Sequence, residues 1–157
     1  MPALAAFMGC DSAPVRTEMV AVAPVVTVPV VEPLPFEGDL DAALEQARRE
    51  DKPLLIFFGT EWCSYCRQLE GDVFARAEFR EASKHFLCVK VDADRAREAC
   101  DAYRVRIYPT LVLAAPDGTA IERLAGYLPA EAIVTRMNVA VGAVVASRTD
   151  LKTPVVR

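Results

Sequence analysis

The spacing of hydrophobic and polar positions predicts regular structure from about residue 38 onwards. In the stretch GDLDAALEQARRED the apolar residues recur at helical spacing, which predicts a first helix with Asp39 or Asp41 as its N-cap. Pro53 prevents this helix from continuing. Residues 54–58 (LLIFF) then form an unbroken apolar run, which is typical of a strand covered on both faces.

The same pattern predicts further helices and strands up to about residue 142. They are a helix interrupted at Gly71, a helix over about 75–84, a strand over 86–92, a helix over 94–103, a hairpin that turns at Asp117 and Gly118, and a last helix opened by Pro129. Such alternation predicts one α/β domain over residues 38–142, with helices on both faces of a central sheet.

The two ends of the chain have a different character. Residues 11–37 are rich in Val and Pro, which predicts an extended linker, part of which can add an edge strand to the domain. The apolar stretch at 19–31 is too short for a membrane span and is broken by prolines. We expect residues 143–157 to form a C-terminal tail.

The first ten residues, MPALAAFMGC, are similar to the end of a bacterial lipoprotein signal, in which the cysteine is lipidated after cleavage. The match is incomplete, because no Lys or Arg precedes the apolar part and Phe7 stands where such signals usually carry Leu. The resemblance implies export to the periplasm, with a lipid anchor on Cys10. The alternative is a cytoplasmic protein in which Cys10 has no role.

Composition narrows the possible partners. The chain has 157 residues, of which 53% are hydrophobic, so it can bury a core without disulfides or metals. Acidic and basic residues are interspersed and the net charge is -4, so we expect neither nucleic acid nor lipid headgroups as partners. The five cysteines are an odd number and are therefore judged one at a time.

Cys63 and Cys66 follow the carboxyl end of the predicted buried strand, where open α/β sheets place their chemistry. If a helix starts at this motif, Cys63 lies at its N-terminal end, where free N–H groups and the helix dipole favour a thiolate. Cys66 lies one turn further in and is more covered. We therefore expect Cys63 to attack a substrate disulfide and Cys66 to resolve the mixed disulfide, leaving a Cys63–Cys66 bond.

The motif WCSYC after a buried strand, with YPT about forty residues later, resembles the thioredoxin superfamily. Residues 38–142 are similar in arrangement to thioredoxin-like thiol-disulfide interchange proteins of the bacterial periplasm. This resemblance implies a thioredoxin fold with a central mixed sheet. It also implies that Cys63 is the nucleophile, Cys66 the resolving thiol and Trp62 an aromatic flank. Tyr108 and a cis Pro109 would present backbone groups to an extended substrate.

Two departures from the family concern the proton that leaves Cys66. Phe57 stands where thioredoxins usually bury an aspartate, and Cys88 replaces a nearby strand lysine. The proton must then go to water, to the substrate or to Glu61, the only acceptor in sequence reach. An equal alternative is that Glu61 is a solvated loop carboxylate that does not take part in proton transfer.

Other chemistries remain as alternatives. His85 and Cys88 could complete a zinc site with the cysteine pair, although both lie on a strand that should be covered. Cys88 and Cys100 are interpreted as small buried hydrophobic residues. Tyr103 and Tyr127 are predicted to pack in the domain, and Arg67 either stabilises a thiolate or is solvated.

The sequence thus predicts a thiol-disulfide oxidoreductase that needs no bound cofactor or metal. We expect a monomer that acts on protein thiols and disulfides, with a membrane thiol reductase as a possible electron donor. Ser64 and Tyr65 separate the cysteines, and the histidine of strong oxidants is absent, which favours the reductive direction. The alternative is a peptide-binding or chaperone-like module of the same fold with little redox activity.

Overall fold

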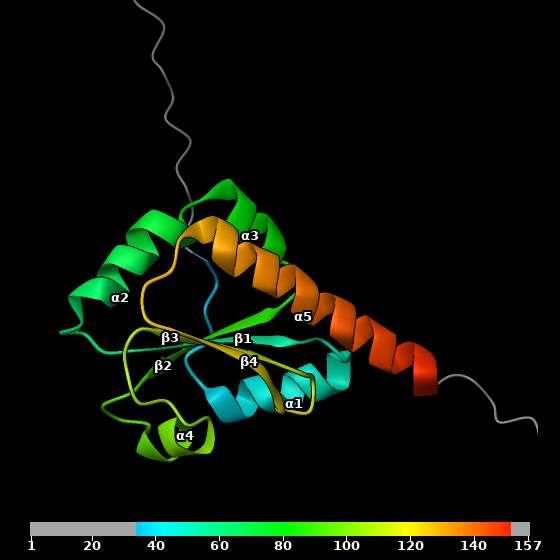
Figure 1. The fold of residues 1–157 in the computed structure, drawn as a ribbon. Coiled ribbons are helices and arrows are strands. Elements are labelled where there is room, and N and C mark those ends of the chain that lie inside the picture. Colours follow the sequence, from blue (N-terminus) through cyan, green and yellow to red (C-terminus); the bar gives the residue numbers. More distant parts are fainter. Residues whose placement is uncertain (1–33, 152–157) are drawn as a thin grey trace, which may run out of the picture. The chain divides into compact units, whose positions relative to one another are not determined.

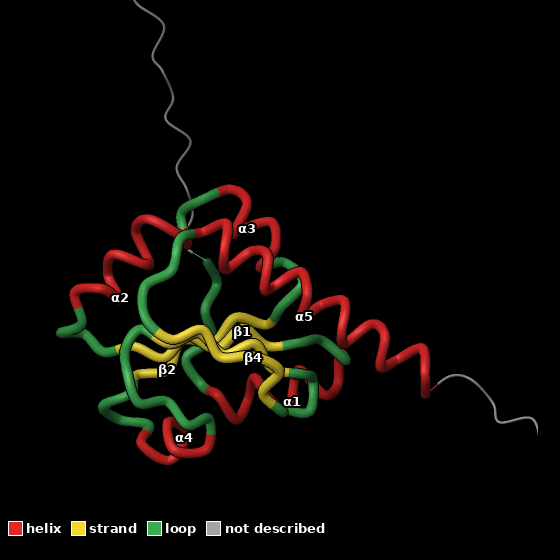
Figure 2. Tube along the Cα trace, in the orientation of Figure 1, coloured by secondary structure: helices red, strands yellow, loops and turns green. Residues whose placement is uncertain are grey.

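The computed structural model describes residues 34–151. A four-stranded sheet forms the centre, with helices on both faces (Figures 1 and 2). In chain order the elements are α1 (Leu40–Glu50), β1 (Leu54–Gly59), α2 (Ser64–Leu69), η1 (Glu70–Phe74), α3 (Ala77–Ser83), β2 (Leu87–Asp92), α4 (Arg97–Ala102), β3 (Thr110–Ala114), β4 (Ala120–Ala125) and α5 (Ala130–Leu151). The predicted α/β architecture is therefore confirmed.

The sheet is mixed and has the strand order β2-β1-β3-β4. β1 pairs in parallel with β2 and antiparallel with β3, and β3 and β4 form the predicted hairpin. All six residues of β1 are buried, as expected for a strand with a neighbour on each side and helices on both faces. The carboxyl end of this central strand leads directly into the cysteine motif.

Alternate residues of β1 belong to two separate cores. Leu55 and Phe57 face α2, η1, α3 and α5, whereas Leu54, Ile56 and Phe58 face α1 and α4. Figure 1 shows the same division, with α2, α3 and α5 on one side of the sheet and α1 and α4 on the other. Because side chains of a strand alternate between its faces, the LLIFF run supplies both cores.

Local signals explain where several helices begin and end. Asp39 is the N-cap of α1 and accepts hydrogen bonds from the amides of Asp41 and Ala42. Near Gly71, where an interruption is predicted, α2 continues without a break into the π-helical turn η1. A π turn inserts an extra residue into the helix, and it changes the direction of the side chains that follow.

Both boundaries of the domain differ from those expected. Residues 34–37 lie within the predicted linker, yet Leu34 and Phe36 pack against the core on the α5 side. Glu37 forms a parallel bridge with Val89 at the edge of β2, in agreement with the expectation that part of the linker adds to the sheet. The linker and anchor predictions for the preceding residues, Cys10 included, lie outside the described residues.

At the other end, α5 continues to Leu151, past the predicted boundary at 142. Val144 is buried, and Arg148 pairs with Asp51 at 2.6 Å, so packing and an ion pair extend the helix into the expected tail. The segment Ala130–Arg148 is long and apolar enough to cross a membrane, with a mean hydropathy of 1.3. Ile133, Met137 and Ala140 nevertheless lie in the core of the domain, where an apolar helix face is expected.

Candidate active site

The cysteine motif forms a disulfide at the start of α2. Cys63 and Cys66 are bonded, with their Cα atoms 5.2 Å apart. Cys63 is the N-cap of the helix, and its Sγ accepts a hydrogen bond from the Cys66 amide at 3.1 Å. Free N–H groups and the dipole at a helix N-terminus favour a thiolate at this sulfur after reduction. The geometry therefore suits reversible thiol-disulfide exchange.

The exposure of the two sulfur-bearing residues differs less than expected. Cys63 is 6% exposed and Cys66 is 2% exposed, so both are largely covered in the disulfide form. The prediction that Cys63 is exposed is wrong for the disulfide form, because its sulfur is bonded to Cys66 and packs in the core. Cys63 is still the more exposed of the two cysteines, as predicted.

Gly59 and Phe57 form the wall behind Cys66. A β-carbon added at Gly59 would lie 3.2 Å from Cys66 Sγ and 3.1 Å from the Phe57 ring. The Phe57 ring also contacts Phe74 edge-to-face, with 5.2 Å between the ring centres. An aromatic ring thus fills the space beside Cys66 that the family usually gives to a buried carboxylate.

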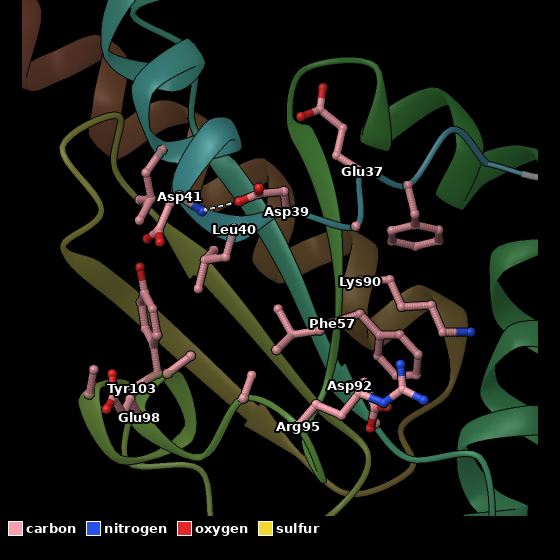
Figure 3. A pocket seen from close by; sticks show the side chains of 18 of the residues that line it. Glu37, Asp39, Leu40, Asp41, Phe57, Lys90, Asp92, Arg95, Glu98 and Tyr103 are labelled. Carbon is pink, nitrogen blue, oxygen red and sulfur yellow. Dashed lines mark hydrogen bonds and ion pairs between the residues drawn. The ribbon is translucent and has the colours of Figure 1, made fainter.

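A charged pair lies beside the Phe57 ring. Lys90 is the register partner of Phe57 in the parallel β1–β2 pair, and its Nζ lies 5.7 Å from the ring centre. The same Nζ contacts the Glu70 carboxylate at 2.7 Å. In Figure 3 the Lys90 side chain lies beside Phe57 at the wall of a broad groove. The strand lysine missing at position 88 thus has a counterpart two residues later.

An exposed aromatic and aliphatic rim is formed by residues of the cysteine motif and of the loop before β3. Trp62, Tyr65 and Ile107 are 67%, 60% and 55% exposed. The Trp62 indole N–H donates to the Asp94 carboxylate at 2.8 Å, and its ring lies edge-to-face against half-buried Tyr108. The peptide bond between Tyr108 and Pro109 is cis. Segments far apart in sequence thus meet beside the disulfide.

Glu61 and Arg67 shape the loop that precedes α2. Glu61 is exposed, and its backbone carbonyl accepts a hydrogen bond from the Arg67 guanidinium at 2.6 Å. Of the two alternatives for Arg67, the structure shows a solvated side chain that ties this loop to the helix. The Glu61 side chain lines the groove, and its role as a proton acceptor stays a prediction.

The remaining described cysteines lie inside the domain, as predicted. Cys88 and Cys100 are free and buried. Burial raises the pKa of the Cys88 thiol to about 12. Burial also raises the pKa of Cys100, although a hydrogen bond with Tyr108 partly opposes this effect. Both thiols are therefore protonated near neutral pH and are poor nucleophiles.

The zinc alternative gains no support from this arrangement. His85 is exposed, whereas Cys88 is buried, and the sulfurs of Cys63 and Cys66 are bonded to each other. Within residues 34–151 no group of three or more His, Cys, Asp or Glu side chains could hold a metal ion.

The two predicted packing tyrosines have different environments. Tyr103 is buried and its hydroxyl donates to the Gly118 carbonyl at 3.1 Å, which confirms its structural role. Tyr127 is 38% exposed, and its hydroxyl donates to Asp72 at 3.3 Å. The predicted packing of Tyr127 is limited to the surface, where its hydroxyl links the loop after β4 to η1.

The burial of Cys88 and Cys100 predicts selective alkylation of the reduced protein. In a Cys10→Ala background at about pH 8, iodoacetamide is expected to modify Cys63 rapidly while Cys88 and Cys100 stay unmodified, because their raised pKa values keep them protonated. Mass spectrometry of peptides checks this, with urea-unfolded protein as the control in which all four remaining cysteines react. Rapid labelling of Cys88 in the folded protein would contradict the assignment.

Several residues of the site were not singled out from the sequence. Asp94 reaches Trp62 across 32 positions, and Lys90 and Ile107 come to the site only through the fold. Glu70 was not singled out either. One signal was available: Cys66 and Glu70 are four residues apart on a predicted helix, so they share a face. Contacts between β1 and β2 need the strand register, which the sequence does not define.

Comparison with known proteins gives the same picture. The sequence model of the thioredoxin-like domain matches residues 40–140. The thiol:disulfide interchange protein DsbD of Pseudomonas fluorescens is 30% identical over 105 residues, which cover 63% of this chain but only 18% of that protein. A thioredoxin of Alicyclobacillus acidocaldarius is 32% identical over 98 residues, which cover 62% of this chain and 90% of that thioredoxin.

Solved structures support the fold. The structure of a DsbH oxidoreductase superposes with a TM-score of 0.62 at 24% identity, covering 74% of this chain and 90% of that chain. The mixed four-stranded sheet with helices on both faces agrees with this match. The chain therefore belongs to the thioredoxin-like domain family, and it carries the Cys63–Cys66 disulfide at the start of α2.

Proposed function

We propose that this protein is a thiol-disulfide oxidoreductase that exchanges electrons between its Cys63–Cys66 pair and cysteines of other proteins. The observation that carries this proposal is the disulfide itself, which lies at a helix N-terminus with the Cys66 amide donating to Cys63 Sγ. A sulfur in this environment is stabilised as the thiolate, which is both the attacking and the leaving form in disulfide exchange.

In the reductive direction the reaction has two steps. The Cys63 thiolate attacks one sulfur of a substrate disulfide, forms a mixed disulfide and releases the other substrate sulfur as a thiolate. Cys66 then loses its proton and attacks Cys63 Sγ, which breaks the mixed disulfide and releases the second substrate thiolate. The substrate gains two electrons, and its two thiolates take up one proton equivalent from Cys66 and one from solvent, while the enzyme is left with the Cys63–Cys66 disulfide.

The exposed rim is the proposed contact surface for the substrate chain. Trp62, Tyr65 and Ile107 offer apolar area around an otherwise covered disulfide. The backbone at Tyr108 and Pro109, next to Trp62, is proposed to pair with an extended substrate segment. Apolar contacts of this kind would hold the substrate while the two sulfur atoms react.

We propose the reductive direction, with a membrane thiol reductase as electron donor and no bound cofactor. The support is the sequence between the cysteines, Ser64-Tyr65, which lacks the histidine of strong oxidants. One relative is named a thiol:disulfide interchange protein and another a disulfide bond reductase, the DsbH of Chlamydia pneumoniae.

The cellular context also stays a proposal. Export to the periplasm and lipidation of Cys10 rest on the first ten residues, and a tether over the following Pro-rich segment rests on composition. A monomer is proposed. Mass spectrometry of the protein from a bacterial host would detect a diacylglyceryl group on Cys10 if this proposal holds.

The proposed function predicts a reducing redox potential for the cysteine pair. Equilibration with glutathione mixtures, followed by alkylation of free thiols, is expected to give a potential nearer to thioredoxin, at about −270 mV, than to DsbA, at about −120 mV. The wild-type protein should also accelerate the reduction of insulin by dithiothreitol.

Two different results would count against this proposal. A pair that never opens and closes in these mixtures would exclude the oxidoreductase, and peptide binding without redox cycling would favour the chaperone-like module. A potential close to that of DsbA would leave the activity intact but reverse its direction.

A further inference from the structure

Resolution of the mixed disulfide requires a proton acceptor for a thiol that lies in a covered position. Cys66 is 2% exposed, and the nearest wall consists of Gly59 and the Phe57 ring. Neither can accept a proton. The thiol must nevertheless be deprotonated before it attacks Cys63 Sγ, since the thiolate is the nucleophile.

Glu70 is a carboxylate residue that lies one helical turn after this thiol. It follows Cys66 by four residues, and its amide donates to the Cys66 carbonyl, so both residues lie on one face of the helix one turn apart. The Glu70 carboxylate lies 2.7 Å from Lys90 Nζ. That Nζ in turn lies over the ring of Phe57. The Phe57 ring and Cys66 Sγ both lie next to the position of a β-carbon at Gly59.

A solvent-accessible groove runs along Glu70, Lys90 and Gly59, the residue of the wall behind Cys66. Its volume is about 1570 Å³, and its lining includes Phe57, Gly59, Thr60, Glu70 and Lys90. Thr60 is 8% exposed, and within the described part of the chain its Oγ1 has no hydrogen-bond partner. A buried hydroxyl without a protein partner in the wall of a polar groove is a typical position for an ordered water. The groove therefore offers a polar, hydrated path between Glu70 and Gly59, where an added β-carbon would lie 3.2 Å from Cys66 Sγ.

We propose that the Glu70 carboxylate, positioned by Lys90, accepts the proton of the Cys66 thiol through water in the groove during resolution. This inference rests on the proposed oxidoreductase function. The Cys66 S–H bond breaks and its proton passes to a Glu70 oxygen, while the sulfur lone pair attacks Cys63 Sγ. The bond between Cys63 and the substrate sulfur breaks, and the departing thiolate takes up a proton from Glu70 or from solvent.

Other charged groups line the same groove and affect the electrostatic potential at Glu70. They include Lys90 and Asp92 of β2, Arg67 of α2, Glu61 of the cysteine loop, Glu37 of the edge segment and Arg95 after β2. The same lining also contains Asp39, Asp41, Arg48, Asp94, Arg97, Glu98 and Asp117. Figure 3 shows Glu37, Lys90, Asp92 and Arg95 around the groove. Glu61 is the competing acceptor and is therefore included in the test.

The test follows the release of a coloured thiol from an aromatic disulfide in the stopped flow, in a full-length Cys10→Ser background. The first phase reports attack by Cys63 and the second reports resolution by Cys66. Glu70→Gln is expected to slow the second phase about tenfold near neutral pH and to leave the first unchanged, an effect smaller than for a directly bonded base. Lys90→Met should slow the second phase less than Glu70→Gln does, and Lys90→Arg should keep the second phase at the wild-type rate.

A pH series from about 5 to about 9 separates proton transfer from a structural effect. Resolution by the wild-type protein is expected to stay fast below the usual thiol range, whereas Glu70→Gln should lose rate steeply as the pH falls. The matched control is Glu78→Gln, which removes another exposed, ion-paired carboxylate on α3. It should behave as the wild type at every pH.

The outcomes distinguish this inference from the proposed function. If the wild-type protein releases no thiol in a second phase, the oxidoreductase proposal fails. If the wild-type protein resolves normally but Glu70→Gln matches it at all pH values, only the role of Glu70 is overturned. The same holds if Glu61→Gln alone slows resolution, or if Glu70→Gln changes the first phase alone.

Discussion

Cys66→Ser is expected to remain joined to its substrate through Cys63, and its turnover of insulin is expected to fall at least about a thousandfold. The reason is the loss of an intramolecular nucleophile, since positioned groups act at effective concentrations of about 10⁵ M or more, far above any added thiol. Serine is nearly isosteric with Cys66 and should preserve the packing against Gly59 and Phe57. Non-reducing electrophoresis should reveal the trapped complex, which dithiothreitol dissolves.

Two companion variants define the order of attack. Cys63→Ser should lose turnover equally but accumulate no complex, because Cys66 is covered and lacks the helix N-cap position. Cys100→Ala removes a buried thiol elsewhere and should retain turnover. Trapping through Cys66 in the Cys63→Ser variant would reverse the assigned roles of the two sulfurs.

Phe57→Ala is expected to lower the free energy of unfolding by about 3–5 kcal/mol, the range for deletion of a buried aromatic ring. The Phe57 side chain is fully buried and contacts the rings of Phe36 and Phe74. Its removal leaves a cavity beside Cys66 that the central strand cannot fill, because β1 is held by neighbours on both sides. Urea unfolding of the oxidised protein, followed by circular dichroism, measures the change.

The control for this stability measurement is Val139→Ala on α5. Val139 is 63% exposed, so its truncation should change the free energy of unfolding by no more than about 0.5 kcal/mol. A similarly small effect of Phe57→Ala would mean that the ring is not a main element of this core.

Much of the fold could be predicted because its signals are local. The run at 54–58 indicates a doubly covered strand, Pro53 and Asp39 mark the ends of neighbouring elements, and the hairpin turn has a specific sequence at Asp117-Gly118. The cysteine pair could be assigned for the same reason, since its chemistry depends on a strand end and a helix start that adjoin in sequence.

The remainder of the site depends on contacts that no local pattern encodes. The pairing of Phe57 with Lys90 requires the parallel register of β1 and β2, and the Trp62–Asp94 hydrogen bond joins two loops. The length of α5 was underestimated because Val144 and the ion pair of Arg148 with Asp51 stabilise a segment whose composition resembles a tail. Tertiary contacts of this kind override local preference.

The absence of a side chain at Gly59 lets the sulfur of Cys66 lie close against the central strand. A β-carbon at position 59 would approach that sulfur to 3.2 Å, which is tighter than most such contacts, so the sulfur or the strand would have to shift to admit it. The glycine therefore sets how deeply the second sulfur of the pair is seated in the domain, and a larger residue at this position would push that sulfur outward, away from the sheet.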